Sequence, residues 1–147
     1  MVNSMEQYSK PLKVERTRLG KKYWLNPRRT KPGRELVVIY DQNLFLFDLP
    51  IRYSYFVRFF EKNNFAGNHY HNEKKEVFIP IEGEFEVHLE NIITKENEIV
   101  KLNALDIIAF SIETQIAHKV VSRKETGTLL VLASQPSKDG DEVEYKL

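Results

Sequence analysis

Apolar and polar residues alternate in short stretches along most of this chain, as they do in β-strands that bury one face. Residues 84–91 show the pattern best, because Phe85, Val87 and Leu89 alternate with charged or polar residues. His88 falls on the polar face and is predicted to lie at the surface. No stretch has a convincing helical period. The predicted strands are residues 35–40, 44–47, 51–60, 76–81, 84–93, 99–102, 106–110, 118–122 and 128–133.

Turn-forming residues separate these strands, for example at positions 41–43, 62–64, 82–83 and 95–97. Many short strands at regular spacing, with almost no helix, predict an all-β antiparallel sandwich or barrel. A jelly roll, a lipocalin-like barrel and an immunoglobulin-like sandwich all satisfy this pattern, and periodicity leaves the three open.

Composition narrows the choice of partners and location. The chain has 147 residues, enough for one domain with a hydrophobic core. It carries 22 basic and 21 acidic residues, so neither nucleic acid nor an anionic membrane is expected as a main partner. The absence of cysteine excludes disulfides and thiolate metal ligands. No apolar run has the length of a membrane span or a signal peptide, so a cytoplasmic location is expected.

Basic residues are concentrated in residues 1–34, where three prolines interrupt the chain. A nucleic-acid-binding arm is one interpretation of this segment. The favoured interpretation is a basic extension whose Tyr23-Trp24-Leu25 patch packs on the barrel or on a second subunit. Residues 35–147 then form the β-domain.

The candidate chemistry lies in residues 67–83. His69 and His71 are two residues apart, so on a strand their imidazoles point to the same face. Four residues further on, Glu76 opens the next predicted strand, where its carboxylate can approach the same point. Gly83 falls where a tight turn begins, which suits a backbone with positive φ.

Two neutral imidazoles and a carboxylate suit a borderline divalent ion such as iron(II), manganese, nickel, cobalt or zinc. One further histidine would complete a site that keeps positions open for water or substrate. His118 is the better candidate, because it begins a strand that can close beside the first two histidines. The sequence therefore predicts a metal site made of His69, His71, Glu76 and His118.

The same residues resemble the first motif of the cupin superfamily, Gly-x-His-x-His, four residues, Glu, six residues, Gly. The match holds at every defining position: Gly67, His69, His71, Glu76 and Gly83. The resemblance implies an all-β cupin jelly roll, a double-stranded β-helix barrel with little helix. It also implies a homodimer that pairs through edge strands.

The second cupin motif is only partly present. Asp106 and His118 agree with it, whereas Glu113 and Gln115 stand where the motif has a proline and a glycine. The turn before His118 is therefore expected to differ from the usual one.

Within the superfamily, the chain resembles the sugar-nucleotide cupins: deoxysugar ketoisomerases and epimerases, and cupin domains of capsule-sugar synthesis enzymes. Their pattern has an Arg-Gly-x-Leu-like strand entry, then Ile-(Lys/Arg)-x-x-Tyr, then Gly-x-His-x-His. Residues 32–36, 51–55 and 67–71 follow this order. The metal-free ketoisomerases tend to carry Arg and Gln where this chain has Ala66 and Glu76, so the glutamate favours a metal-binding member.

Either face of the predicted strand 51–60 can point into the barrel. If the arginine face points inward, Arg52 and Arg58 can bind a phosphate or carboxylate of a substrate. If the tyrosine face does, Tyr53 and Tyr55 can supply a proton donor or a surface that stacks on a sugar. The arginines are interpreted as facing water, and the role of the tyrosines stays open.

The resemblance implies an isomerase or epimerase with a small-molecule substrate, a sugar or a nucleotide-linked sugar. Either the metal would polarise a carbon next to a carbonyl, or His71 would act as a base and deprotonate it. Tyr53 or Tyr55 would then return the proton. Two alternatives remain, an iron-dependent oxygenase and a non-catalytic module that binds a small ligand.

Overall fold

The computed structural model describes residues 5–42 and 46–147. Their strands are β1 (Lys13–Arg16), β2 (Gly20–Trp24), β3 (Tyr53–Phe59), β4 (Phe65–His71), β5 (Glu76–Glu82), β6 (Glu84–Asn91), β7 (Asn97–Asn103), β8 (Ile108–Ile112), β9 (Ile116–Ser122), β10 (Gly127–Ala133) and β11 (Glu142–Glu144). Two short 3-10 helices, η1 (Glu6–Ser9) and η2 (Ala104–Asp106), are the helical elements of the described residues.

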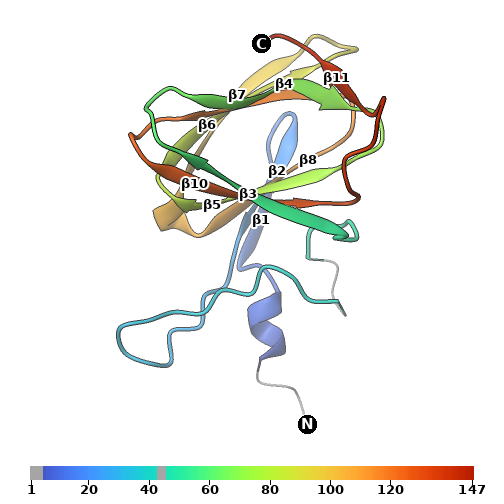
Figure 1. The fold of residues 1–147 in the computed structure, drawn as a ribbon. Helices are drawn as coiled ribbons and strands as arrows, with labels where there is room; N and C mark the ends of the chain where they lie inside the picture. Colours follow the sequence, from blue (N-terminus) through green and yellow to red (C-terminus); the bar gives the residue numbers. More distant parts are fainter. Residues whose placement is uncertain (1–4, 43–45) are drawn as a thin grey trace.

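The strands form two antiparallel sheets that face each other (Figure 1). One sheet has the order β1-β2-β8-β5-β10-β3, and the other has the order β11-β4-β9-β6-β7. Neighbouring strands in each sheet are mostly far apart in sequence, as in a jelly roll. The predicted all-β fold with little helix is confirmed.

The main hydrophobic core lies between the two sheets. The alternation predicted for residues 84–91 is present in β6, where Phe85, Val87 and Leu89 are at most 1% exposed. His88 lies on the other face of β6, half-buried beside Glu86. Gly83 is the single residue between β5 and β6, which belong to opposite sheets; it adopts φ +91°, and an added Cβ there would lie 2.9 Å from a backbone oxygen.

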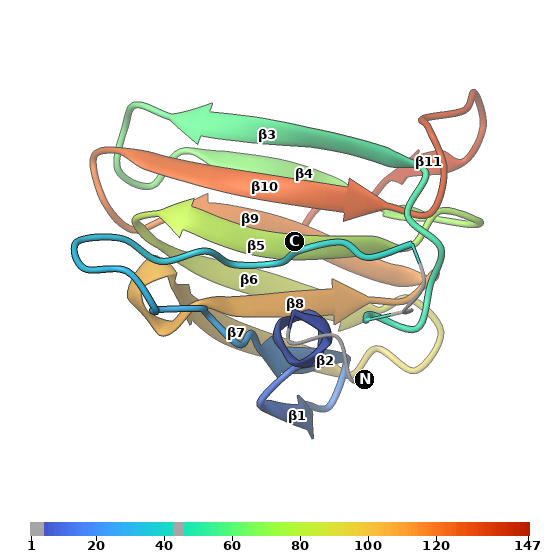
Figure 2. The ribbon, with the colours of Figure 1, turned by 90° about the horizontal axis from the view of Figure 1, so that it is seen from below.

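A second apolar cluster covers the outer face of the six-stranded sheet. The segment that leads from β2 to β3 runs across this face (Figure 2), and its Phe47 and Leu49 are buried there. The Phe47 ring meets the Tyr23 ring edge to face, with 5.1 Å between the centroids. The central strands β5 and β8 are therefore largely buried on both faces.

The prediction of a strand at residues 35–40 is wrong. Leu36 forms an isolated bridge with Arg28, and residues 37–40 are not in a strand. Val37 and Ile39 are apolar because they pack against the outer cluster, which a covering segment can do without strand pairing. The predicted strand 44–47 lies partly outside the described residues.

The basic segment at the start of the chain contributes strands to the six-stranded sheet. β2 pairs with β8 from Gly20 opposite Ile112 to Trp24 opposite Ile108. Tyr23 and Leu25 are 2% and 3% exposed, so the patch packs on the sheet of its own chain. The division into residues 1–34 and 35–147 stays a prediction.

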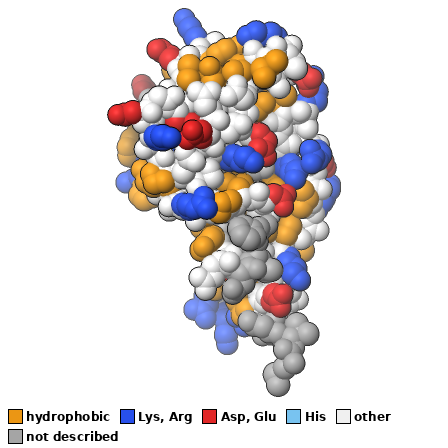
Figure 3. All heavy atoms as spheres, turned by 90° about the vertical axis from the view of Figure 1, so that its right-hand side faces the viewer, with side chains coloured by type: hydrophobic (Ala, Val, Ile, Leu, Met, Phe, Trp, Pro, Cys, Tyr) orange, Lys and Arg blue, Asp and Glu red, His pale blue; other side chains and the backbone are white. Residues whose placement is uncertain are grey.

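Charged side chains of both signs share one face of the molecule (Figure 3). On the face shown in Figure 3, acidic and basic side chains lie interspersed among apolar ones, in keeping with a net charge of +1. Among residues 5–42 and 46–147, no helix is long and apolar enough to cross a membrane. The cytoplasmic location stays a prediction.

Candidate active site

The four predicted metal ligands lie together between the two sheets. His69 and His71 are at the end of β4, His118 is on the adjacent β9, and Glu76 begins β5 of the opposite sheet. Each offers one ligand atom, and these atoms lie within 4.8 Å of one another. His71, Glu76 and His118 are at most 3% exposed. The His69 side chain is 23% exposed, so it marks the solvent side of the cluster.

A close approach of two strands brings the histidines together. Gly67 has φ +107°, and a Cβ there would lie 2.5 Å from the carbonyl oxygen of His118. The register between β4 and β9 shifts at Asn68, after which His69 lies opposite His118. A residue with a side chain at position 67 would push the strands apart, which explains the need for glycine.

The altered second motif still positions His118. Gln115, at the place of the motif glycine, adopts φ +66°, the left-handed conformation that costs a non-glycine residue about 1–2 kcal/mol. Its amide donates to the His71 carbonyl at 2.9 Å, and its side chain donates to Asn72 Oδ1 at 2.8 Å. These contacts offset the strain and join the turn to the end of β4.

The Glu76 carboxylate is the centre of the cluster. Its Oε1 lies 3.1 Å from His71 Nε2 and 3.2 Å from His118 Nε2. Its Oε2 accepts a hydrogen bond from the Tyr55 hydroxyl at 3.1 Å and lies 3.9 Å from Lys74 Nζ. Burial alone would raise the pKa of Glu76, but the two imidazoles hold that pKa well below its ordinary value. Glu76 is therefore an anion at neutral pH.

Each imidazole turns its Nδ1 toward an oxygen atom. The distances are 3.1 Å from His118 to the Ile116 carbonyl, 3.3 Å from His71 to Asp141 Oδ2, and 3.3 Å from His69 to Glu142 Oε1. The Ile116 carbonyl can only accept, so His118 carries a proton at Nδ1. His71 Nδ1 and Asp141 Oδ2 are close but not aligned as a hydrogen bond. Burial, followed by the nearby His118, lowers the pKa of His69 to about 4, so His69 is neutral at neutral pH.

The donor set fits a divalent metal ion. His71 Nε2 and Glu76 Oε1 are buried and close, yet they are not aligned as a hydrogen bond. A lone pair on Nε2 facing a carboxylate oxygen is unfavourable unless a proton or a cation lies between them. Three imidazoles and one carboxylate are ligands that iron(II), manganese, nickel, cobalt and zinc accept. The Nδ1 acceptors are the outer contacts that such ligands commonly make.

The tyrosine face of β3 is the one that points inward. Phe59 is 4% exposed in the core, and Tyr55 reaches Glu76. The Tyr53 ring lies 5.8 Å from the Tyr55 ring, and the two residues are 39% and 36% exposed. Burial and the Glu76 carboxylate raise the pKa of Tyr55, so its hydroxyl keeps its proton. Both tyrosines therefore lie at the border between the cluster and solvent.

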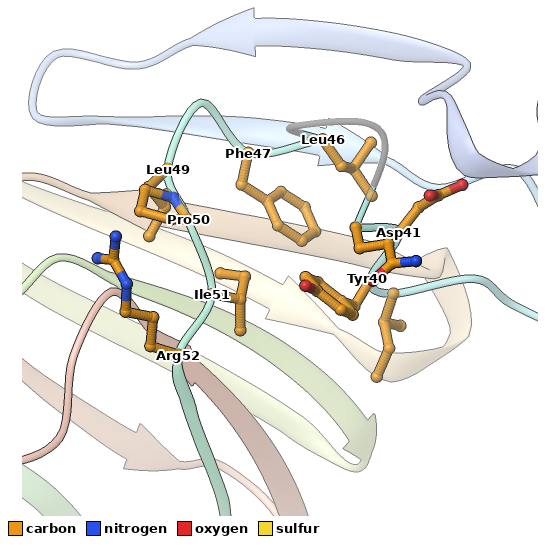
Figure 4. A pocket seen from close by; sticks show the side chains of 10 residues that line it. Tyr40, Asp41, Leu46, Phe47, Leu49, Pro50, Ile51 and Arg52 are labelled. Atoms are coloured by element: carbon orange, nitrogen blue, oxygen red, sulfur yellow. The ribbon is translucent and has the colours of Figure 1, made fainter.

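The arginine face of β3 points outward. Arg52 and Arg58 are exposed, and Arg52 Nη1 donates to the Ser134 carbonyl at 3.2 Å. Arg52 also lines a cavity of about 300 Å³ within the segment that covers the outer face of the sheet, formed by residues 39–42, 46–47 and 49–52 (Figure 4). The histidine-cluster residues do not line this cavity.

Three residues of the site were missed by the sequence analysis. Lys74, which lies in the turn between β4 and β5, is 3% exposed. Asp141 and Glu142 belong to the polar tail that follows β10. β11 pairs with β4 and places Glu142 opposite His71, so the tail reaches the histidines. A cavity of about 290 Å³ lies between this tail, His71 and Lys74. No local pattern signals these contacts.

A jelly roll that gathers His69, His71, Glu76 and His118 between its sheets is a cupin. A protein-family model described as FdtA, WxcM-like, C-terminal matches residues 26–146, and the chain belongs to this family. Among curated protein sequences, none matches the chain significantly.

Solved structures of sugar-nucleotide enzymes have the same fold. QdtA from Thermoanaerobacterium thermosaccharolyticum, a sugar 3,4-ketoisomerase in complex with TDP, is 24% identical over 86% of this chain and 88% of its own, with a TM-score of 0.72. A 3,4-ketoisomerase from Helicobacter canadensis is 18% identical over 84% and 89%, with a TM-score of 0.74. The 3,5-epimerase RmlC from Legionella pneumophila is 13% identical over 90% and 76%, with a TM-score of 0.76. The predicted resemblance to sugar-nucleotide cupins is confirmed.

Proposed function

We propose that this protein is an isomerase or epimerase of a nucleotide-linked keto sugar, and that His71 is its base. The observation that carries the proposal is the buried His71 itself, with Nδ1 facing Asp141 and Nε2 facing the interior of the cluster. Related structures support the substrate class, since QdtA was solved with TDP-4-keto-6-deoxyglucose and RmlC with dTDP-4-keto-L-rhamnose.

The chemistry needs one base and one acid near a carbonyl. A base removes the proton from the carbon next to the carbonyl and leaves an enediolate. In an epimerase, a proton then returns to the opposite face of the same carbon. In an isomerase, a proton returns to the former carbonyl carbon, while the proton of the neighbouring hydroxyl passes to the former carbonyl oxygen, so that the neighbouring carbon becomes the new carbonyl. His71 can accept the first proton at Nε2, because the Asp141 carboxylate stabilises the imidazolium that forms. We propose that Tyr53 or Tyr55 returns the proton.

The same cluster is proposed to hold a divalent cation, iron, manganese, nickel, cobalt or zinc, through His69, His71, Glu76 and His118. A bound cation would supply Lewis-acid stabilisation of an oxyanion next to the reacting carbon. Both proposed roles of His71 use Nε2. Cation binding by His71 and proton abstraction by His71 are therefore alternatives at this nitrogen.

A homodimer is also proposed. The edge strand β3 has free backbone groups along one side, and its Phe56 is 65% exposed, which suits pairing with a second copy. Light scattering coupled to gel filtration is expected to give twice the chain mass. The mass of a single chain would contradict this part.

The test is turnover of TDP-4-keto-6-deoxyglucose in D₂O, followed by NMR. We expect deuterium to appear on carbon next to the carbonyl, and the product to be an isomeric keto sugar or an epimer. The free sugar without the nucleotide serves as the control for substrate class. No deuterium uptake with purified protein, whether freed of metal or supplied with each of the five metals, would contradict the proposal. Oxygen uptake with iron(II) would favour the oxygenase instead.

A further inference from the structure

Lys74 is a buried cation next to the cluster. It is 3% exposed, and its Nζ lies 3.9 Å from Glu76 Oε2 and 3.3 Å from Ser137 Oγ. An ammonium group is seldom removed from water unless an opposite charge compensates it. Glu76 is the anion within reach, so the two residues form a buried charge pair.

The two oxygens of the Glu76 carboxylate have different partners. Oε2 is occupied by Tyr55 and Lys74, whereas Oε1 faces His71 and His118. A divalent cation among the imidazoles would be the second positive charge at a single carboxylate. In a buried place the repulsion between that cation and Lys74 is only weakly screened.

We infer that Lys74 is a built-in counter-ion of Glu76 that weakens cation binding at the four ligands and so keeps His71 Nε2 free to act as a base. The inference rests on the proposed cation site and on the proposed role of His71. It makes Lys74 a positioning residue, because it acts through Glu76.

The experiment compares Zn²⁺ affinity in Lys74→Met and the wild type, by calorimetry on metal-free protein at neutral pH. Met has nearly the shape of the lysine stem without its charge. We expect Lys74→Met to bind Zn²⁺ about tenfold more tightly or better, because the repulsion is gone. Lys74→Gln, which can still form hydrogen bonds, is expected to show the same gain, and it carries the test if Lys74→Met does not fold.

Lys138→Met is the matched control. Lys138 lines the same cavity, but its side chain is 63% exposed and it pairs with Glu73 at 3.2 Å. Solvent screens its charge, so its removal is expected to change Zn²⁺ affinity by less than about twofold. Adding His118→Ala to Lys74→Met is expected to abolish the gain, which places the Zn²⁺ at the cluster.

The outcomes separate the inference from the proposed function. Zn²⁺ binding by Lys74→Met supports the inference when the wild type binds more weakly or not at all. The inference is overturned if Lys74→Met and Lys74→Gln both bind Zn²⁺ no more tightly than the wild type. It is also overturned if Lys138→Met gains as much Zn²⁺ affinity as they do. Wild-type turnover of the TDP-sugar is measured separately, and a lack of turnover would overturn the proposed isomerase while leaving the Zn²⁺ comparison intact.

Discussion

Glu76 and Glu98 are two glutamates of this barrel with opposite kinds of surroundings. The Glu98 side chain, 12% exposed, accepts hydrogen bonds from the Thr17 hydroxyl and from the Leu19 and Arg18 amides at 2.8–3.0 Å. Burial alone would raise its pKa, but these donors lower it. The Oε1 of Glu76 is buried, yet it has no aligned donor.

The difference separates a structural carboxylate from one available for chemistry. Glu98 closes the turn between β1 and β2 and ties this hairpin to β7, and each of its oxygens is satisfied within the protein. Glu76 keeps one oxygen directed at two imidazoles in an arrangement that a proton or a cation would complete. A fully satisfied carboxylate stabilises the fold, whereas a partly satisfied one remains reactive.

The largest effect is expected at the reactive region. His71→Asn should lower kcat/KM for the TDP-keto sugar by about 10²–10⁴-fold, because general base catalysis is lost. The assay is the NMR turnover described above, with thermal unfolding to confirm that the variant is folded. His88→Asn, outside the cluster, is the control and should keep normal activity. Equal activities of the two variants would remove His71 from the mechanism.

The next effect is expected at the buried charge pair. Glu76→Gln leaves the Lys74 ammonium without its counter-ion and should lower the free energy of unfolding by about 3 kcal/mol, measured in urea. The double variant Glu76→Gln with Lys74→Met should lose less than Glu76→Gln alone. Glu113→Gln removes a carboxylate from the exposed pair with Lys75 and should change stability by less than about 0.5 kcal/mol. Additive losses in the double variant would show that the pair is not coupled.

A smaller loss is expected at the structural carboxylate. Glu98→Ala removes the acceptor of three hydrogen bonds and should cost about 2 kcal/mol, since the freed amides lie at a turn that water can reach. Activity toward the TDP-keto sugar should be unchanged at temperatures where the variant is folded. A large loss of activity in folded protein would mean that the hairpin also shapes the site.

The smallest effect is expected in the dependence on pH. Because folding lowers the pKa of Glu98, its contribution to stability is present above the unfolded pKa and is lost as pH falls through the folded value. Between pH 7 and pH 3, the wild type should therefore lose more unfolding free energy than Glu98→Gln, which cannot titrate there. Parallel curves for the two proteins would contradict the lowered pKa.

Much of the site could be predicted from sequence because its first three ligands are close along the chain. His69, His71 and Glu76 are fixed by strand periodicity and one turn. His118 lies in a strand about 40 residues after Glu76, and its position was inferred from how strands close a barrel. Lys74 was missed because neighbouring lysines in a turn usually face water, and here the tail covers one of them.

The ends of the fold were harder to predict for a related reason. β1 is fully exposed and β2 is rich in lysine, so neither shows the alternation of a half-buried strand. Val37 and Ile39 pack against the outer cluster although residues 37–40 belong to no strand. In each case the partner is set by tertiary arrangement, which local patterns do not encode.

β11 connects the imidazoles to local opening of the structure. This strand has three residues, lies at the edge of its sheet and pairs with β4. Short edge elements can detach at a small fraction of the free energy of global unfolding. Detachment of β11 would carry Asp141 and Glu142 away from His71 and His69 while the barrel stays closed. Amide exchange at Val143 should then be much faster than at Val87, and exchange at equal rates would show that β11 opens only with the whole barrel.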